Sequence, residues 1–407
     1  MHEIYTKIRN RTEYLVNSLE PEDTVPQPMT DVSPTKWHLA HTTWFFETFI
    51  LIPFSKSYKI FNENYNYLFN SYYQSKGDRV RRDFRGFHSR PTMKEVLNYR
   101  KYIDENIIKL LYSNTDKEEI ERRVTLGIHH EEQHQELLLT DLKYTWSFSP
   151  FYPIFSNAIQ SWNKEQFQKK WLKVNEGLYE IGNSSKEFHF DNESPKHKIF
   201  LNEFKIQSLP VTNGEYLEFI EENGYDTWEF WLSDGWAWVS ENQISSPLYW
   251  KKIDGKWYEY TLNGLIELNK DLPLTHISFY EADAFARYQK SRLPTEGEWE
   301  VACCLFGPER KKYGFLEDSN YHPKIFDKDI LFRGNVWQWT NSAYLPYPGF
   351  KPWEKGLGEY NGKFMINQMV LRGGSCVTPF HHIRNTYRNF FYPHQRWQFT
   401  GIRLAKD

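Results

Sequence analysis

The sequence predicts a two-part chain of the class α + (α+β), in which a helical bundle precedes a loop-rich domain with short strands. The chain of 407 residues is longer than a single hydrophobic core usually allows. Apolar residues recur at helical spacing up to about residue 148, and beyond it Pro, Gly, Asn and Trp interrupt short segments. We therefore expect a helical domain over 1–148, a connector over 149–167 and an α+β domain over 168–407.

The helical periodicity of the first part separates into four long segments. The pair Ser33-Pro34 precedes the second segment, Thr92 precedes the third, and residues 113–116 (SNTD) offer capping oxygens to the fourth. The segments lie near residues 3–19, 35–53, 93–113 and 117–146. Four helices of this length predict an up-and-down bundle, whose interior can hold a metal ion.

The second part is predicted to be loop-rich because short strand-like segments alternate with turn residues. Two such segments are HKIFLNEFKI and MVLRGGSC. Convincing helical periodicity is confined to residues near 212–223 and 279–289. The connector is rich in aromatic residues and proline, so we expect it to pack along the surface of one or both domains.

Composition and charge exclude several classes of protein. Aromatic residues make up 18% of the chain, which indicates a globular rather than a disordered protein. The 50 Lys and Arg residues nearly cancel the 53 Asp and Glu residues, so no nucleic-acid partner is expected. No stretch is apolar enough for a signal peptide or a membrane span. Cys303, Cys304 and Cys376 form no disulfide framework, so we expect a reduced, cytoplasmic protein. The sequence does not determine its oligomeric state.

The segment GIHHEEQHQE at residues 127–136 carries the sharpest chemical signal. His130 and His134 lie four residues apart, so on a helix both imidazoles share one face and can bind one ion. That face is otherwise mostly apolar and continues to Asp141. The same letters contain HExxH, the pattern of zinc proteases, in which Glu131 would act as the general base. Histidines that only pack in a core or lie on the surface are the remaining interpretation.

A third ligand is expected from the second helix, where WHLAHTTWFF offers His38 and His41. His41 shares its face with Trp37, Trp44 and Phe45, so we select His41 and expect His38 to be a neighbour or a surface residue. Imidazole suits both iron and zinc, and the sequence does not decide between them. Three neutral histidines would leave open positions on iron for a thiolate and O2, which suits oxidative sulfur chemistry.

Taken in order, the motifs resemble the sulfoxide synthases of EgtB type, which act in ergothioneine biosynthesis. This resemblance implies a DinB-like helical domain followed by a formylglycine-generating-enzyme-like domain with a C-type-lectin-like fold. It rests on the segments SPTKWHLAHTTWFFETF, GIHHEEQHQELLLTDLKY, LPVTNGEYLEF, HISFYEADAFARY, SRLPTEGEWEVA, GNVWQWT, VLRGGSC and FTGIRLA.

The resemblance also bears on two rival enzymes. Zinc proteases carry no domain like the second one, and residues 130–136 match the family's HxxxHxE signature with Glu136 as its last member. Formylglycine-generating enzymes rely on a redox-active cysteine pair near the C-terminus, where this chain has only Cys376. Cys303 and Cys304 are interpreted as packing residues.

By resemblance the chain would be a non-haem iron enzyme that uses O2 to join a thiol sulfur to the imidazole of hercynine. The resemblance implies an Fe(II) site formed by three ligands, His41, His130 and His134. Gln133 would contact the imidazole of the substrate. Asn389 and Phe390 match the positions that embrace its trimethylammonium group, which aromatic faces and oxygen dipoles can hold.

The expected thiol donor follows from a departure within the family. Members that use γ-glutamylcysteine carry an Asp and an Arg where this chain has Phe391 and Gln395, and they place catalytic tyrosines in a Tyr-x-x-Tyr segment that is missing from GFKPWEKGLGEYNGKF. This chain has Tyr72-Tyr73 instead, like the branch that uses free cysteine. In that branch Arg82 would bind the cysteine carboxylate and Asp31 would help to hold its amino group.

Other functions stay open at this point. A selenoneine-type synthase on the same scaffold would use a selenium donor, and an ovothiol-type enzyme would use unmethylated histidine. A zinc hydrolase or a metal-free binding module would carry no sulfur chemistry at all. Arg85 and Arg90 have no assigned role, and surface ion pairs are an equal interpretation for both.

Overall fold

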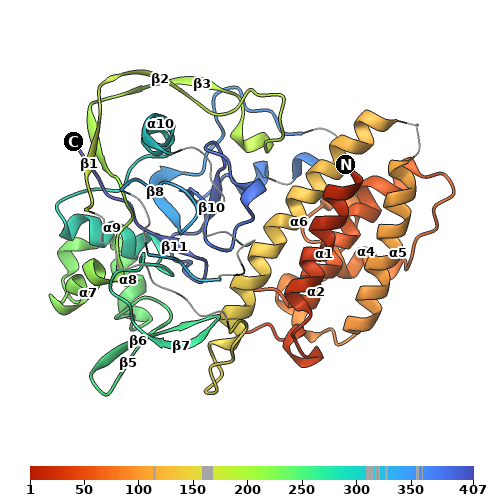
Figure 1. The fold of residues 1–407 in the computed structure, drawn as a ribbon, viewed down its shortest axis with the longest axis horizontal. Helices are drawn as coiled ribbons and strands as arrows, with labels where there is room; N and C mark the ends of the chain where they lie inside the picture. Colours follow the sequence, from red (N-terminus) through yellow and green to blue (C-terminus); the bar gives the residue numbers. More distant parts are fainter. Residues whose placement is uncertain are drawn as a thin grey trace. The chain divides into compact units, whose positions relative to one another are not determined.

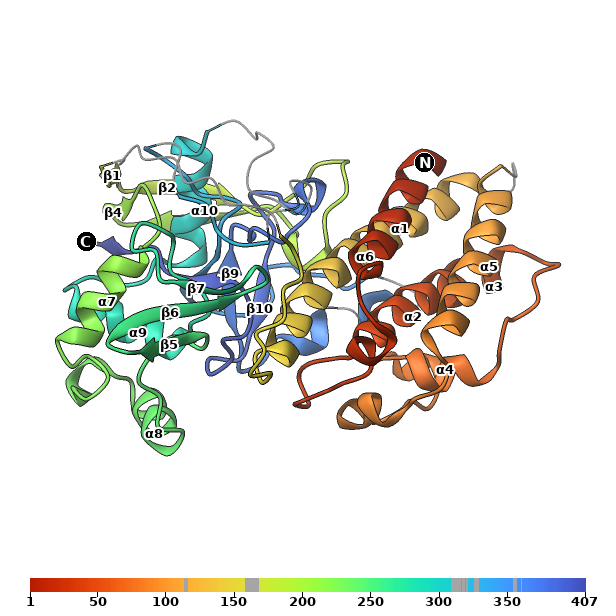
Figure 2. The same cartoon turned by 60° about the horizontal axis from the view of Figure 1, so that its bottom comes forward.

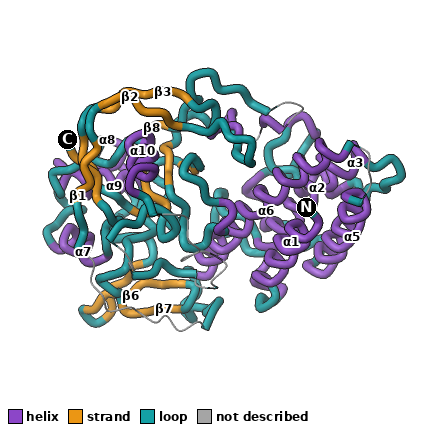
Figure 3. The backbone as a smooth tube through the Cα atoms, turned by 45° about the horizontal axis from the view of Figure 1, so that its top comes forward, coloured by secondary structure: helices purple, strands orange, loops and turns teal. Residues whose placement is uncertain are grey.

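A computed structural model describes residues 1–112, 116–157, 168–308, 316, 319, 321–325, 329–353, 357–359 and 361–407. The chain divides into two compact units, Met1–Phe148 and Ser149–Asp407. Helices build the first unit, and the strands of the described residues all lie in the second (Figure 3). None of the described helices is long and apolar enough to cross a membrane.

The helical unit contains the four long helices that periodicity predicts (Figure 1), with two short α-helices between the second and the third. The expected second helix ends in a π-helical turn, Glu47–Leu51, before α3. The helices are α1 (His2–Val16), α2 (Thr35–Phe46), α3 (Ile52–Phe54), α4 (Asn64–Phe69), α5 (Met93–Leu111) and α6 (Lys117–Trp146).

Helix α2 is the centre of this unit. Every residue from Thr35 to Phe46 is buried, because α2 packs against α4, α5 and α6. The two helices of the metal motif lie especially close at Gly127, where a Cβ atom would come 2.5 Å from Cε1 of Phe46. A helix buried on all sides has no polar face, so the apolar stripe expected on α2 is replaced by uniform burial.

Capping fixes where some of these helices begin. Thr92 starts α5 with a capping box, in which its hydroxyl accepts from the Glu95 backbone N–H and the Glu95 carboxylate accepts from the Thr92 N–H. Asp116 is the N-cap of α6, but its side chain makes no capping hydrogen bond. The other proposed capping residues of α6, at 113–115, lie outside the described residues.

The second unit is built from short strands in small sheets (Figure 2). Among the described residues the strand pairs are antiparallel, apart from the parallel pair Thr400–Gly401 and Trp337–Ala343. Their orders are β1-β4-β12, β10-β9-β8-β11, β2-β3 and β5-β6-β7. The strands are β1 (Trp171–Val174), β2 (Gly177–Ile181), β3 (His197–Leu201), β4 (Phe204–Gln207), β5 (Trp250–Ile253), β6 (Lys256–Thr261), β7 (Gly264–Glu267), β8 (Trp337–Ala343), β9 (Met369–Arg372), β10 (Asn389–Phe391), β11 (Thr400–Gly401) and β12 (Ala405–Lys406).

Helices of this unit include two that periodicity misses. Helices α7 (Asn213–Glu221) and α9 (Phe279–Tyr288) lie where they are expected, whereas α8 (Ser233–Glu241) and α10 (Glu296–Phe306) are not predicted. Helix α10 brings Trp299 into a hydrophobic core with Phe204, Ile206 and Phe332. Its start was readable in the sequence, because Thr295 and Glu298 form a capping box.

The described part of the connector packs on the second unit. The Tyr260 hydroxyl donates to the Pro153 carbonyl at 2.9 Å, and the backbone N–H of Phe155 donates to the Leu262 carbonyl at 2.8 Å. The rest of the connector, residues 158–167, lies outside the described residues.

Candidate metal centre

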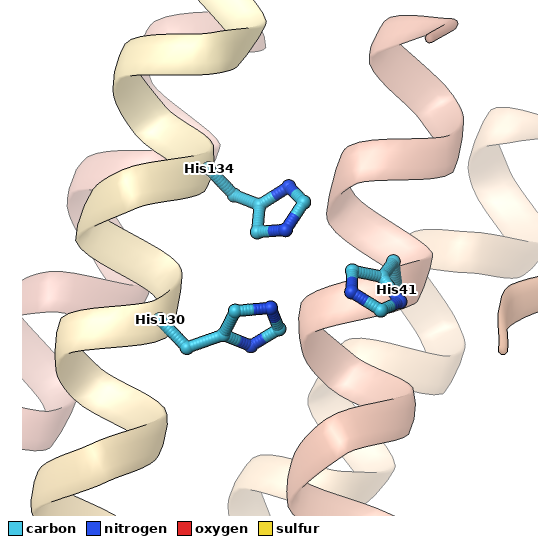
Figure 4. A group of neighbouring side chains, drawn as sticks. All are labelled: His41, His130 and His134. Carbon is cyan, nitrogen blue, oxygen red and sulfur yellow. The ribbon is translucent and has the colours of Figure 1, made fainter. Parts of the chain in front are cut away.

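Three imidazoles converge inside the helical unit. His41 comes from α2, and His130 and His134 come from successive turns of α6, with the three rings turned toward one another (Figure 4). Each ring offers one nitrogen, and these nitrogens lie within 4.8 Å of one another. His41 and His130 are each only 1% exposed, and His134 is partly buried. Side chains separated by about 90 residues thus form one compact cluster of nitrogen donors.

The His41 ring is held by its surroundings. Its Nδ1 donates to the Phe69 carbonyl at 2.6 Å, which leaves Nε2 as the nitrogen with a free lone pair. Trp37 stacks on the ring at a centroid distance of 4.5 Å, and Trp44 stacks at 5.6 Å. The carbonyl fixes the tautomer and the indoles fix the ring plane, as expected for a metal ligand.

His134 is held by His38, a histidine outside the cluster of three. Its Nδ1 lies 2.8 Å from Nδ1 of His38, and Nε2 of His38 lies 3.0 Å from Oδ2 of Asp141. His38 is 3% exposed, so of the two positions expected for it, neighbour or surface, the surface one is wrong. It is a buried neighbour of the cluster, because α2 is buried on every side.

The cluster fits a divalent transition metal. Burial, reinforced by the neighbouring imidazoles, lowers the pKa of His41 and His134 well below the usual value for histidine. Burial likewise lowers the pKa of His130 to about 3. Metals bind neutral imidazole, so the three rings are in the form that ligation requires at neutral pH. Three nitrogen donors would leave further coordination positions for substrates.

Glu131 does not face this cluster. Its carboxylate accepts from Arg9 at 2.6 Å, from Arg100 at 2.9 Å and from the Thr12 hydroxyl at 2.6 Å. Burial alone would raise the pKa of Glu131, but Arg100 and Arg9 lower it to about 2. A carboxylate that is fully buried among these partners is a poor general base for a metal-bound water. The geometry therefore argues against the HExxH hydrolase interpretation.

Tyr72 and Tyr73 stack on each other at 4.7 Å. Tyr73 is fully buried and packs against Trp44 at 5.7 Å and against Phe49 at 4.9 Å. Because Trp44 also stacks on His41, a single indole separates Tyr73 from the cluster. Tyr72 is less buried than Tyr73.

The two residues expected to hold the amino and carboxylate groups of cysteine are bonded to each other. Arg82 donates to the Asp31 carbonyl at 2.7 Å, and its guanidinium lies 3.8 Å from the Asp31 carboxylate. Their side chains are 52% and 34% exposed, so both are accessible to a solute.

Deeper in the same loop, Arg85 covers the face of Trp37, with its Cζ atom 3.5 Å from the ring centroid. Lys36 and Arg85 are 5% and 8% exposed, and both line a cavity of about 20 Å³ with Trp37 and Arg90. Within the described residues, no carboxylate lies within 4.0 Å of the charged nitrogens of Lys36 or Arg85. Burial, then the nearby Arg82, lowers the pKa of Arg85 well below its usual value. Buried cations are ordinarily paired, so this wall of the unit is suited to an anionic group.

Family comparisons agree with the two-unit architecture. The model of the DinB superfamily matches residues 4–138, and that of the sulfatase-modifying factor enzyme 1-like domain matches residues 158–329 and 330–407. A hercynine oxygenase of Mycolicibacterium smegmatis is 31% identical over 314 residues, covering 70% of this chain and 72% of that relative. The chain belongs to the hercynine oxygenase family. The expected fold class, a DinB-like unit followed by a formylglycine-generating-enzyme-like unit, is confirmed.

Two further relatives cover less of their own length. A hercynine oxygenase of Mycobacterium tuberculosis is 31% identical over 241 residues, which cover 53% of this chain and 56% of the relative. Ergothioneine biosynthesis protein 1 of Schizosaccharomyces pombe is 28% identical over 238 residues, which cover 54% of this chain and 28% of the relative. As a member of the hercynine oxygenase family, the chain is an oxygen-dependent oxidoreductase related to ergothioneine biosynthesis.

The remaining residues that the sequence singled out in this chain lie in both units. Gln133 precedes His134 on α6 and is partly buried. Asn389 and Phe390 begin β10, where Phe390 stacks on Tyr344 at 3.9 Å and the Asn389 side chain accepts from the Phe390 N–H at 2.9 Å. This stacking orients the Phe390 ring.

Phe391 and Gln395 have local partners in the second unit. The Phe391 ring packs edge-on against Trp397 at 6.0 Å. The Gln395 carboxamide accepts from the Tyr392 backbone N–H at 3.0 Å, so it closes the turn between them. Neither side chain carries a charge.

Sequence reasoning missed three features of the centre, namely the Phe69 carbonyl, the His38–Asp141 pair and the buried Arg85. Asp141 lies seven residues after His134, on the same helical face, which was a usable signal. The Phe69 carbonyl had no signal, because a backbone acceptor can belong to any residue type.

Proposed function

We propose that the chain is a non-haem Fe(II) hercynine sulfoxide synthase that uses free cysteine. One thiol, one imidazole C–H and one O2 would give a sulfoxide joined to the imidazole carbon between the two nitrogens, and one water. The sulfur and the ring carbon are oxidised, and O2 receives four electrons. One of its oxygen atoms enters the sulfoxide and the other leaves as water.

The observation that carries this proposal is the buried cluster of three neutral imidazoles within an oxygen-dependent family. His41, His130 and His134 would hold the metal. Bound Fe(II) would supply redox chemistry with O2 and would favour the thiolate form of a thiol substrate. Glu131 takes no part, because its carboxylate is held by Arg9 and Arg100.

The proposed thiol site is the arginine-rich loop beside the cluster. Arg82 and Asp31 would receive the carboxylate and the amino group of cysteine. The buried Arg85 donates through Nη1 to the Ser33 hydroxyl at 2.9 Å, but its Nε has no hydrogen-bond partner. It adds support for a carboxylate-bearing thiol, since an anion at this wall would compensate its charge. Phe391 and Gln395 offer no charge to a glutamyl group, so a small thiol is favoured over γ-glutamylcysteine.

Gln133, Asn389 and Phe390 would bind hercynine. The carboxamide of Gln133 can hydrogen-bond an imidazole nitrogen, and it precedes a proposed ligand directly on α6. A trimethylammonium group donates no hydrogen bond, so an aromatic face such as Phe390 and an amide oxygen such as that of Asn389 are suitable partners.

The tyrosine pair would supply a proton or an electron during oxygen chemistry. Trp44 lies between Tyr73 and His41 and contacts both rings, and Tyr72 stacks on Tyr73. We assign Tyr72 as the residue that reaches the substrate and Tyr73 as its neighbour.

Anaerobic loading with Fe(II), followed by O2, cysteine and hercynine with mass detection of the sulfoxide, tests the proposal. We expect one Fe(II) per chain and product from cysteine. The variant His134→Ala should lose Fe(II), whereas His189→Ala in the second unit should retain it.

Three results would overturn parts of this proposal. Full Fe(II) binding by His134→Ala would remove the metal site. Product from γ-glutamylcysteine but not from cysteine would reverse the donor. Preference for a selenium donor over cysteine in a direct competition would assign the chain to the selenoneine-type reaction.

A further inference from the structure

A hydrogen-bonded chain of side chains leads from the metal cluster to a carboxylate. It runs from His134 to His38, with Nδ1 atoms 2.8 Å apart, and from His38 to Asp141 at 3.0 Å. The Asp141 carboxylate also accepts from the Ser33 backbone N–H at 2.8 Å. His38 and Asp141 are 3% and 5% exposed, so the hydrogen bonds between these side chains are shielded from water.

Hydrogen-bond chemistry allows one arrangement of protons if His134 binds a metal through Nε2. The other nitrogen, Nδ1, must then carry the proton and donate it to Nδ1 of His38. That nitrogen of His38 must be an acceptor, so the His38 proton lies on Nε2. A proton on Nε2 needs an acceptor in turn, and the Asp141 carboxylate supplies it. Each tautomer is fixed by the next group in the chain.

We propose that His38 and Asp141 are positioning residues of the metal centre, which fix the tautomer and orientation of His134 and raise its basicity as a ligand. This inference rests on the proposed metal site. It gives His38 a role that differs from ligation, although it lies three residues from His41 on the same helix.

A comparison with His41 explains why His134 needs a side chain as the acceptor for its Nδ1 proton. His41 finds its acceptor in a backbone carbonyl of α4. His134 projects from the middle of α6, where the nearby backbone carbonyls are engaged in helical hydrogen bonds. A side chain from α2 therefore supplies the acceptor, and Asp141 orients it from the same face of α6 as His134.

A pair of substitutions at His38 separates positioning from packing. Asn can place its carbonyl oxygen near the position of Nδ1 and still accept from His134, whereas Leu fills the volume but accepts nothing. We expect His38→Leu to weaken Co(II) binding about 10- to 100-fold and to shift the Co(II) absorption bands. His38→Asn should keep most of the affinity. A packing role predicts the reverse order, because Leu fills a buried site better than Asn does.

Anaerobic Co(II) titration of the full chain, in competition with a chelator, measures this order. The pair Asp141→Asn and Asp141→Leu repeats the comparison one step further out, and it decides the question if His38→Leu does not fold. His189→Leu, in the second unit, controls for loss of a histidine. Wild-type affinity and an unchanged spectrum in His38→Leu or Asp141→Leu overturn the inference. Failure of the unaltered protein to bind Co(II) instead overturns the proposed metal site itself.

Discussion

Replacing Glu131 with Gln distinguishes a structural carboxylate from a catalytic one. Glu131 is fully buried and joins Arg9 on α1 to Arg100 on α5. A carboxyl whose pKa falls from 4.5 to about 2 contributes about 3 kcal/mol to the free energy of unfolding. Removing one partner from a buried ion pair costs about 3–5 kcal/mol, which agrees with that figure. We therefore expect Glu131→Gln to destabilise the helical unit by about 3 kcal/mol.

Thermal unfolding followed by circular dichroism at 222 nm measures this loss. For a unit of this size, each kcal/mol lowers Tm by about 2–4 °C, so we expect a fall of about 6–12 °C. Glu119→Gln is a matched control on the same helix. Arg122 and Arg123 likewise lower the pKa of Glu119 to about 2. Its side chain is 31% exposed, however, so solvent screening limits its contribution to about 0.5 kcal/mol.

The pH dependence has a defined sign. Folding lowers the pKa of Glu131, so its contribution is fully present above about pH 4.5 and is lost as the pH falls toward 2. The Tm difference between Glu131→Gln and the unaltered protein should thus be constant above pH 5 and narrow below it. Equal Tm values for the Glu131 and Glu119 variants would refute the ion-cluster reasoning. Loss of activity with no loss of stability would restore Glu131 as a candidate base.

Three further changes test the site and its scaffold. Arg85→Met should raise the KM for cysteine about 10- to 100-fold and leave that for cysteamine, which lacks the carboxylate, unchanged; an equal rise for both thiols would contradict the anion site. Tyr72→Phe should lower kcat for sulfoxide formation more than Tyr73→Phe does, with Fe(II) stoichiometry intact in both; the opposite order would exchange their roles. Gly127→Ala should lower Tm, because a Cβ atom would lie 2.5 Å from Phe46 and overpacking costs about 1–3 kcal/mol; an unchanged Tm would show that the α2–α6 contact can relax.

The long helices were predictable because their apolar residues recur over many turns. Helices α5 and α6 follow this rule, with Val96, Ile103 and Ile107 buried on one and Ile120 and Leu138 on the other. The short helices α8 and α10 were missed because neither carries a clear apolar stripe: α8 buries only Gly235 and Val239, and α10 is buried continuously over residues 297–303. The sequence signal for α10 was its capping box, Thr295 and Glu298.

The choice between His38 and His41 shows where sequence reasoning reached its limit. Periodicity ranks the two by the apolar character of their faces, yet the structure leaves them 3% and 1% exposed. What separates them is the partner of each Nδ1, a His134 nitrogen for one and the Phe69 carbonyl for the other. Such partners come from helices far apart in the chain, so no local pattern can reveal them.

The motif HHEEQHQE is best understood as two interleaved sets of residues on one helix. His130 and His134 face α2, whereas Glu131 and Gln135, one residue later in each turn, face α1. The Gln135 carboxamide donates to the Ile8 carbonyl at 3.0 Å, and Glu131 binds Arg9. Polar contacts with α1 therefore hold the face of α6 that carries Glu131 and Gln135. One residue corresponds to a rotation of about 100° about the helix axis. Rotating α6 by one residue would therefore bury two polar side chains without partners and turn both imidazoles away from His41. The ion cluster thus has a consequence beyond stability, because it fixes the direction in which the proposed ligands point.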